Sequence, residues 1–301
     1  MKRISAVLLG SIMAISALAQ KNNTDHTLLW KISGNGLAEP SYLFGTIHML
    51  CKDDAVLSDS LKNIIQNVKE VYFEVDLDNM FEMLGVMGKM KMKGDTTLQD
   101  LLNEADYEKV KNYFETKGSI LPFSMLETYK PILAASTLQQ GDIPCETTAM
   151  MEQVIMMEAK EYNKPIKGLE SMGYQAGVLD SIPYKLQAEQ LVSYIDNAIK
   201  GKDEDGEMVE MLNAYKSQDL KRMEELILKS DPSISNYTDI LLHNRNRNWV
   251  EKLKDLMPGK PLLIAVGAGH LPGKEGCINL LRQAGYKVTP VKNVMRVNRE
   301  I

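Results

Sequence analysis

Two of the four histidines in the chain stand three residues after a glycine, each at the end of an apolar run. In "SYLFGTIHML" His48 follows Gly45, and in "PLLIAVGAGHLPG" His270 follows Gly267. Glycine allows the backbone to turn sharply or to approach a ligand closely. Imidazole is the commonest metal ligand in proteins and also serves as a general base. The paired motifs predict one site that contains both imidazoles; the alternative is that each histidine has a structural role.

A carboxylate inside an apolar stretch is the third candidate for this site. Glu74 stands in "EVYFEVDL", where a charge is costly unless it is paired or bound to a metal. Two imidazoles, one carboxylate and an open position would make a catalytic metal site that suits Zn, Mn, Fe or Co. Such a metal lowers the pKa of a bound water to about 7. The alternative for Glu74 is an edge-strand or surface carboxylate.

The elements around these residues predict an α/β fold. Residues 28–50 indicate two strands joined by a turn, Ser58 indicates a helix start, and Glu70–Leu77 indicates another strand. Strand, helix and strand in this order favour a parallel pair with a crossover. Ligands bind at the carboxyl ends of strands in such sheets, where both histidines are expected.

The middle of the chain is predicted to be mainly helical, apart from a short strand in "KPIKGLES". In the methionine-rich stretch 79–93, Met80, Met83, Met87 and Met90 recur at the spacing of one helix face. We expect a core or lid helix there. The alternatives are a flexible apolar binding surface, which methionine suits, and a copper site.

The C-terminal part returns to an alternation of helices and strands. Residues 235–254 and 274–284 are predicted as helices, and "PLLIAVGAGH" and "KVTPVKNV" as strands. The expected fold class is therefore α/β, with a central, mostly parallel but mixed sheet flanked by helices and interrupted by a helical insert.

The composition and the N-terminal residues limit the kinds of protein that this chain can be. The 301 residues suffice for a large buried core, and the net charge of −5 disfavours a nucleic-acid partner. Lys2 and Arg3, the apolar run Ile4–Leu18 and the small residues before Gln20 predict a signal peptide. The alternative is an uncleaved anchor, although the run is short for a membrane span.

These features define the predicted organisation of the chain. We predict a signal peptide over residues 1–19 and a single domain over residues 20–301, with its helical insert at approximately 79–230. The mature protein is expected to be periplasmic or secreted, with no stable membrane span.

The cysteines are Cys51, Cys145 and Cys277, an odd number with no metal-ligand spacing. We expect buried or unpaired thiols. One disulfide in an oxidising compartment is an alternative, as is a thiol ligand from Cys51, three residues after His48.

Several blocks resemble a known family in the same order along the chain. They are "YLFGTIHM", "FEVDL", "KPIKGLES", "LLHNRNRNW" and "VGAGHLPG". Together, over roughly residues 28–292, they resemble the TraB/PrgY/GumN family, whose animal relatives include the Tiki proteins, and in particular its bacterial GumN-like branch. The resemblance implies an EreA/ChaN-like α/β architecture with an inserted helical region.

The resemblance also implies an activity and a metal site. Tiki relatives are divalent-metal-dependent proteases whose paired Gly-x-x-His histidines and an acidic residue are regarded as the metal and catalytic site. Carried over by position, these residues are His48, Glu74 and His270. The resemblance favours Mn or Co over Zn or Fe.

Three further positions are carried over as catalytic candidates. Arg245 and Asn246 stand at the matching Arg-Asn positions of "LLHNRNRNW". Arginine can clamp a substrate carboxylate or steady an oxyanion; its alternative role is a buried salt bridge. Glu170 is expected either to orient a histidine N–H or to interact with a helix N-terminus.

The function predicted from the sequence is an exported, divalent-metal-dependent hydrolase, a peptidase acting on a peptide or protein substrate. The alternative is a non-catalytic protein that binds haem or a peptide in the same crevice, because fold does not settle function. A third possibility is a site that only stabilises the fold.

Overall fold

The computed structural model describes most of the chain. The described residues are 26–117, 121–139, 141, 143–201, 204–230 and 235–295. The predicted signal peptide, residues 1–19, lies outside them. Within the described part of the chain, no helix is long and apolar enough to cross a membrane.

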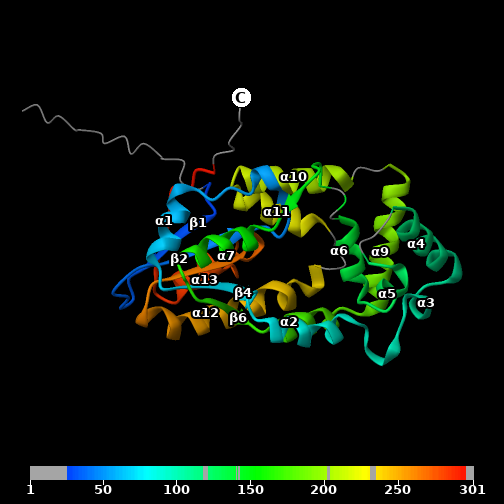
Figure 1. Ribbon diagram of the computed structural model, residues 1–301, viewed down its shortest axis with the longest axis horizontal. Helices are drawn as coiled ribbons and strands as arrows, with labels where there is room; N and C mark the ends of the chain where they lie inside the picture. Colours follow the sequence, from blue (N-terminus) through cyan, green and yellow to red (C-terminus); the bar gives the residue numbers. More distant parts are fainter. Residues whose placement is uncertain are drawn as a thin grey trace, which may run out of the picture.

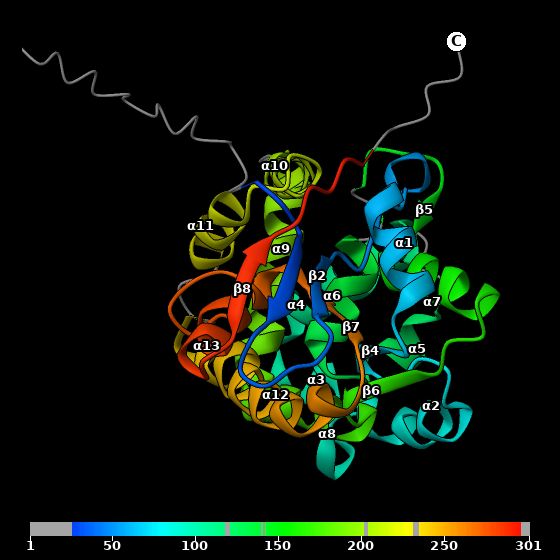
Figure 2. The same ribbon diagram turned by 90° about the vertical axis from the view of Figure 1, so that its left-hand side faces the viewer.

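A six-stranded sheet forms the centre of the molecule (Figures 1 and 2). Its spatial order is β6-β4-β7-β2-β1-β8. The first four strands of this order are parallel, and β1 is antiparallel to both of its neighbours. The prediction of an α/β fold with a mixed, mostly parallel sheet is therefore confirmed. The bounds are β1 Leu29–Ser33, β2 Ser41–Thr46, β4 Glu70–Val75, β6 Ile166–Glu170, β7 Leu262–Gly267 and β8 Lys287–Pro290.

The order of the strands differs from the predicted pairing in one respect. The first strand-helix-strand unit indicated a neighbouring parallel pair, but β7 lies between β2 and β4 and pairs with both. Its residues Leu262–Val266 are all buried, and an apolar run of this kind belongs in the middle of a sheet covered on both faces. Because β7 lies between β2 and β4, the second Gly-x-x-His motif lies between the first motif and Glu74.

Helices cover both faces of the sheet. Figure 2 shows α1 (Asp59–Asn67) and α7 (Met151–Glu161) on one side, and α12 (Asn244–Leu256) and α13 (Cys277–Gln283) on the other. Right-handed crossovers explain this division, because the chain moves from β2 to β6 in one direction along the sheet and returns to β8 in the other. As predicted, Ser58 caps α1: its hydroxyl accepts a hydrogen bond from the Leu61 N–H.

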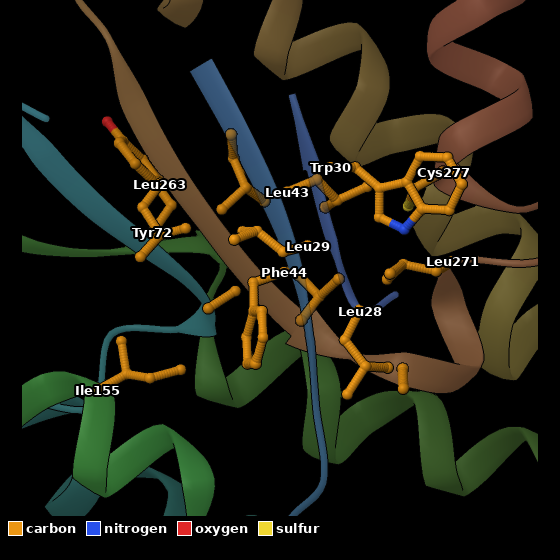
Figure 3. Packing of buried hydrophobic residues seen from close by; sticks show 14 of the residues in the cluster. Leu28, Leu29, Trp30, Leu43, Phe44, Tyr72, Ile155, Leu263, Leu271 and Cys277 are labelled. Atoms are coloured by element: carbon orange, nitrogen blue, oxygen red, sulfur yellow. The ribbon is translucent and has the colours of Figure 1, made fainter. Parts of the chain in front are cut away.

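Several of the remaining helices form a separate lobe on the right of Figure 1. A small core of its own, including Leu98, Phe114, Leu126 and Leu191, holds this lobe together. The main core packs side chains of the sheet strands, such as Leu29, against Ile155 of α7 and the helices of the other face (Figure 3). The bounds are α2 Met80–Val86, α3 Leu98–Leu101, α4 Glu104–Lys117, α5 Phe123–Leu126, α6 Pro131–Gln139, α8 Met172–Val178, α9 Tyr184–Ile199, α10 Glu204–Lys216 and α11 Leu220–Ser230.

Two helix predictions at the C-terminal end require correction. The helix expected over residues 235–254 is a 3₁₀ turn at Ser235–Tyr237, a π-helical turn at Asp239–His243 and then α12. The helix expected from residue 274 begins only at Cys277, because Gly276 has an extended backbone (φ −76°, ψ 153°) and is the N-cap residue of the helix.

The methionine-rich stretch does not form a core helix, which was one of the two forms expected for it, the other being a lid helix. Its first part is α2, which has no buried residue. Met80, Phe81 and Leu84 are 63, 88 and 62% exposed. Within the described residues α2 packs mainly on α8, so most of its apolar surface is left facing solvent.

Candidate active site

The ends of four parallel strands bring the candidate residues to one edge of the sheet. Thr46 at the end of β2 pairs with Gly267 at the end of β7, and Val75 of β4 pairs with Glu170 of β6. The two Gly-x-x-His motifs therefore leave the sheet side by side. Glu74 and Glu170 lie on the strands next to them.

A buried arginine lies at the centre of this edge. Arg245, near the start of α12, is almost fully buried. Its Nη2 lies 2.5 Å from Glu74 Oε2 and 2.7 Å from Glu170 Oε1, and its Nε donates to Glu170 Oε1 at 2.9 Å. Nη1 donates to the Leu241 carbonyl. Of the two roles considered, the arrangement matches the buried salt bridge.

Glu74 is held by donors from three different elements. Its Oε1 accepts from the Gly267 N–H at 2.9 Å, and its Oε2 accepts from Gln175 of α8 at 2.8 Å and from Arg245. Burial alone would raise the pKa of Glu74, but the charges of His270 and Arg245 and the Gly267 N–H lower it to about 2. A side chain at Gly267 would place its Cβ 3.2 Å from Glu74 Oε1, so glycine permits this close approach.

His270 is buried as a neutral imidazole. Its Nδ1 lies 2.6 Å from Asn246 Oδ1, an oxygen that can only accept, so Nδ1 carries the proton. Nε2 is therefore an acceptor, and Arg245 Nη1 lies 3.3 Å from it. Burial lowers the pKa of His270 to about 4, and Arg245 adds to this effect, against the opposing charge of Glu74. At neutral pH the charge that stabilises Glu74 is therefore that of Arg245.

The buried state of His270 predicts a loss of stability in mild acid. Its folded pKa of about 4 is below the ordinary value of 6.5, so the unfolded chain binds the proton first as the pH falls. Between pH 7.5 and pH 5 this group alone is expected to cost about 2 kcal/mol of unfolding free energy. Urea unfolding at both pH values, on the wild type and on His270→Asn, checks this. The variant should lack that part of the pH dependence; parallel losses in the two proteins would contradict the assignment.

The other histidine lies at the rim of the site. The His48 side chain is 69% exposed, and its Nδ1 lies 2.8 Å from Oε1 of the buried Glu152 on α7. Thr46 donates its hydroxyl to the same oxygen at 2.7 Å. The hydrogen bond to Glu152 raises the pKa of His48, partial shielding from water lowers it, and the charges of Glu152 and Glu74 raise it further. The Nδ1–H is thus directed to a carboxylate, and Nε2 is left for a substrate or water.

Asn246 and Glu170 support the buried network. The Asn246 amide nitrogen donates to the Glu275 carbonyl at 2.8 Å, which fixes the oxygen that orients His270. Among the residues that the structure describes, the hydrogen bonds of Glu170 come from neither a histidine nor a helix N-terminus: its Oε2 accepts from Trp249 Nε1 at 2.9 Å, and its Oε1 accepts from Arg245. Burial raises the pKa of Glu170 against the opposing effect of Arg245.

Three polar residues of the site were not predicted from the sequence as functional: Glu152, Gln175 and Thr46. Of these, Glu152 had a detectable signal. It stands three and seven residues before Ile155 and Ala159, on the buried face of its helix, where a carboxylate needs a partner. The remaining histidines are paired with aspartates: His26 lies 3.9 Å from Asp219, and His243, on the turn that packs against the His270 turn, pairs with Asp239.

The donor types for a divalent metal are present, but they do not surround one point. Among the residues that the structure describes, no three His, Cys, Asp or Glu side chains are grouped to hold a metal ion. Both Glu74 oxygens are hydrogen-bonded, and His270 Nε2 faces a cationic guanidinium. The predicted set His48, Glu74 and His270 does not fit a metal in this arrangement, because Arg245 already provides the positive charge between Glu74 and His270.

The sequence matches the TraB/PrgY/gumN family over residues 28–290. The chain belongs to this family. The match confirms the resemblance drawn from the sequence blocks. No solved structure matches the chain, so the comparison with the EreA/ChaN-like architecture stays a prediction.

Curated proteins to which the chain is similar include TIKI metalloproteases and YbaP. The chain is 22% identical to Metalloprotease TIKI2 of Danio rerio, with 87% of this chain and 60% of the relative covered. It is 22% identical to Metalloprotease TIKI1 of Homo sapiens, with 87% and 61% covered. It is 23% identical to the uncharacterized protein YbaP of Escherichia coli (strain K12), with 80% and 87% covered. The chain thus spans about three fifths of the length of these TIKI relatives.

Proposed function

We propose that this family member is an exported peptidase in which His48 activates water and Glu152 orients His48 and stabilises its protonated form. The observation that carries the proposal is the 2.8 Å contact between Nδ1 of the exposed His48 and Oε1 of the buried Glu152. An imidazole with one nitrogen fixed on a carboxylate and the other open is a competent general base. The reaction class is supported by the name metalloprotease of the TIKI relatives.

Each residue of the site has a distinct task in this mechanism. His48 Nε2 takes a proton from the water whose oxygen attacks the peptide carbonyl carbon, and Glu152 stabilises the imidazolium that forms. The imidazolium then gives this proton to the amine as the C–N bond breaks. Glu74 fixes the end of β7 through the Gly267 N–H, beside the end of β2 that leads to His48. All hydrogen-bond donors of Arg245 serve neighbouring groups, so its task is to hold the two buried carboxylates.

An exposed apolar surface beside the site offers a place for the substrate. Helix α2 follows the strand that carries Glu74, and it packs on α8, which carries its hydrogen-bond partner Gln175. Met80, Phe81 and Leu84 leave this helix apolar toward solvent. We propose that it holds apolar side chains of a peptide, because methionine adapts to different shapes.

A divalent metal is implied by the name of the TIKI relatives, with Mn or Co our first choices and Zn or Fe next. Since the present arrangement does not fit one, no step above depends on it. The testing experiment is cleavage of a mixed peptide library by the purified protein, with chelator and with each of these ions, beside elemental analysis. Cleavage that survives the chelator supports the His48–Glu152 mechanism. Cleavage that requires a metal would overturn this mechanism, and no cleavage under any condition would overturn the peptidase.

A further inference from the structure

The two chain segments that carry His48 and Glu152 are joined by a disulfide. Cys51 and Cys145 are bonded, with their Cα atoms 5.8 Å apart. Cys51 stands three residues after His48, and Cys145 stands seven residues before Glu152. The bond thus closes a loop of the chain immediately beside the proposed catalytic pair.

The backbone contacts between the same two segments are few. β3 (Leu50–Cys51) and β5 (Thr148–Ala149) form a separate two-stranded antiparallel sheet of two residues each. Outside it, the Lys52 N–H donates to the Thr147 carbonyl at 3.0 Å. Two-stranded pairs are marginal on their own in water, and this one has only two residues per strand. These hydrogen bonds therefore need further support to keep their register.

The start of α7 depends on this junction. Its N-cap residue, Met150, provides no side-chain hydrogen bond to the first turn. Instead, the Met151 N–H donates to the Ile47 carbonyl at 3.4 Å, next to His48. Glu152 is the following residue, so the position of its carboxylate relative to His48 is set by the contact between the two segments.

We propose that Cys51 and Cys145 are positioning residues whose disulfide keeps His48 Nδ1 within hydrogen-bond distance of Glu152 Oε1. Cys51 and Cys145 are 94 residues apart in the sequence. Without the bond, holding their two segments together would cost the conformational entropy of closing this long loop, and the disulfide lowers that cost. The effect on catalysis rests on the proposed function, whereas the effect on the geometry does not.

The third cysteine is the matched control. Cys277 is free and buried at the start of α13, and burial raises its pKa to about 12. It is therefore a poor target for oxidation or reduction. Cys277→Ala removes a cysteine sulfur on the face of the sheet opposite to α7. It therefore shows the effect of losing a sulfur without losing the disulfide.

The experiment compares the double variant Cys51→Ser/Cys145→Ser with Cys277→Ala in the presence of chelator. Long-range proton–nitrogen NMR of neutral His48 should show the Nδ1–H form in the wild type and in Cys277→Ala, and a shift toward the Nε2–H form in the double variant. Amide hydrogen exchange at Met151 and Lys52 should become about tenfold faster or more in the double variant. Unchanged tautomer and exchange would overturn the proposal, whether or not the protein cleaves peptides.

Two additional measurements complete the test. The first replaces the double variant if that variant does not fold, and the second asks whether the disulfide acts on catalysis through Glu152. If the double variant does not fold, the folded wild type is reduced instead: a dithiol gives two electrons and two protons to the Cys51–Cys145 bond, which becomes two thiols, and is itself oxidised to a disulfide. The same two signals are then read. Where cleavage is found, Glu152→Gln should reduce kcat far less in the disulfide-free background than in the wild type, with KM little changed. Equal reductions in both backgrounds would mean that the disulfide does not act through Glu152.

Discussion

Replacement of Arg245 by methionine is expected to destabilise the protein by about 3–5 kcal/mol, because the change leaves two buried carboxylates without their cation. Glu74 and Glu170 both accept hydrogen bonds from Arg245 Nη2, and all three side chains are almost fully shielded from water. Methionine preserves much of the packing volume, so the loss of charge dominates the result. Urea unfolding at pH 7.5 gives the free energy.

The same helix provides a matched control for this prediction. Arg247 pairs with Glu275 at the surface, and exposed ion pairs contribute at most about 1 kcal/mol. Arg247→Met should therefore change stability by a small fraction of the Arg245→Met effect. Adding Glu170→Gln to Arg245→Met should recover part of the loss, since it removes one of the two unpaired charges. Equal effects of the two arginine variants would show that the buried pair is not the stabilising feature.

This network explains why arginine, two glutamates and a neutral histidine occur together at one sheet edge. Arg245 satisfies Glu74, Glu170 and the acceptor nitrogen of His270 at once, and Asn246, the next residue on the same helix, fixes the proton on the other nitrogen. Both carboxylates thus share one guanidinium. In the proposed mechanism the reactive part of the edge is the rim, where His48 is exposed.

Local features of this fold could be predicted from the sequence, and their causes are local. Ser58 precedes an apolar helical pattern and caps α1, and the hairpin turn between β1 and β2 contains Gly34 and Gly36, both with positive φ. Each Gly-x-x-His motif follows an apolar run that is long enough for one strand. These signals lie within a few residues of each other in the chain.

What could not be predicted depends on contacts between distant segments. The position of β7 between β2 and β4 follows from the return of the chain across the other face of the sheet, which no single segment encodes. The pairing of His48 with Glu152 joins residues 104 positions apart, and the disulfide joins residues 94 apart. The metal set was inferred from residue types, but the guanidinium of Arg245 lies between two of its members.

Replacement of His48 by alanine is expected to lower kcat/KM for peptide cleavage by about 10²–10⁴-fold and to leave stability nearly unchanged. The side chain is exposed, so its removal opens no cavity in the core. Glu152→Gln should lower activity in the same direction, because an amide cannot stabilise the imidazolium as a carboxylate does. Initial rates on a cleaved library peptide and urea unfolding give the two quantities.

His243→Ala is the control for this variant, since His243 is also a partly exposed histidine paired with an aspartate, Asp239, but on the π-helical turn. It should retain full activity. If both histidine variants lost activity equally, the loss in His48→Ala would not be evidence that His48 is the general base. If His48→Ala remained active while Glu74→Gln did not, the water would be activated at the buried end of the site, and the exposed pair would only shape the rim. A loss confined to His48→Ala and Glu152→Gln places the proton transfer on His48, the exposed imidazole of the paired motifs, whose Nδ1 is bound to Glu152.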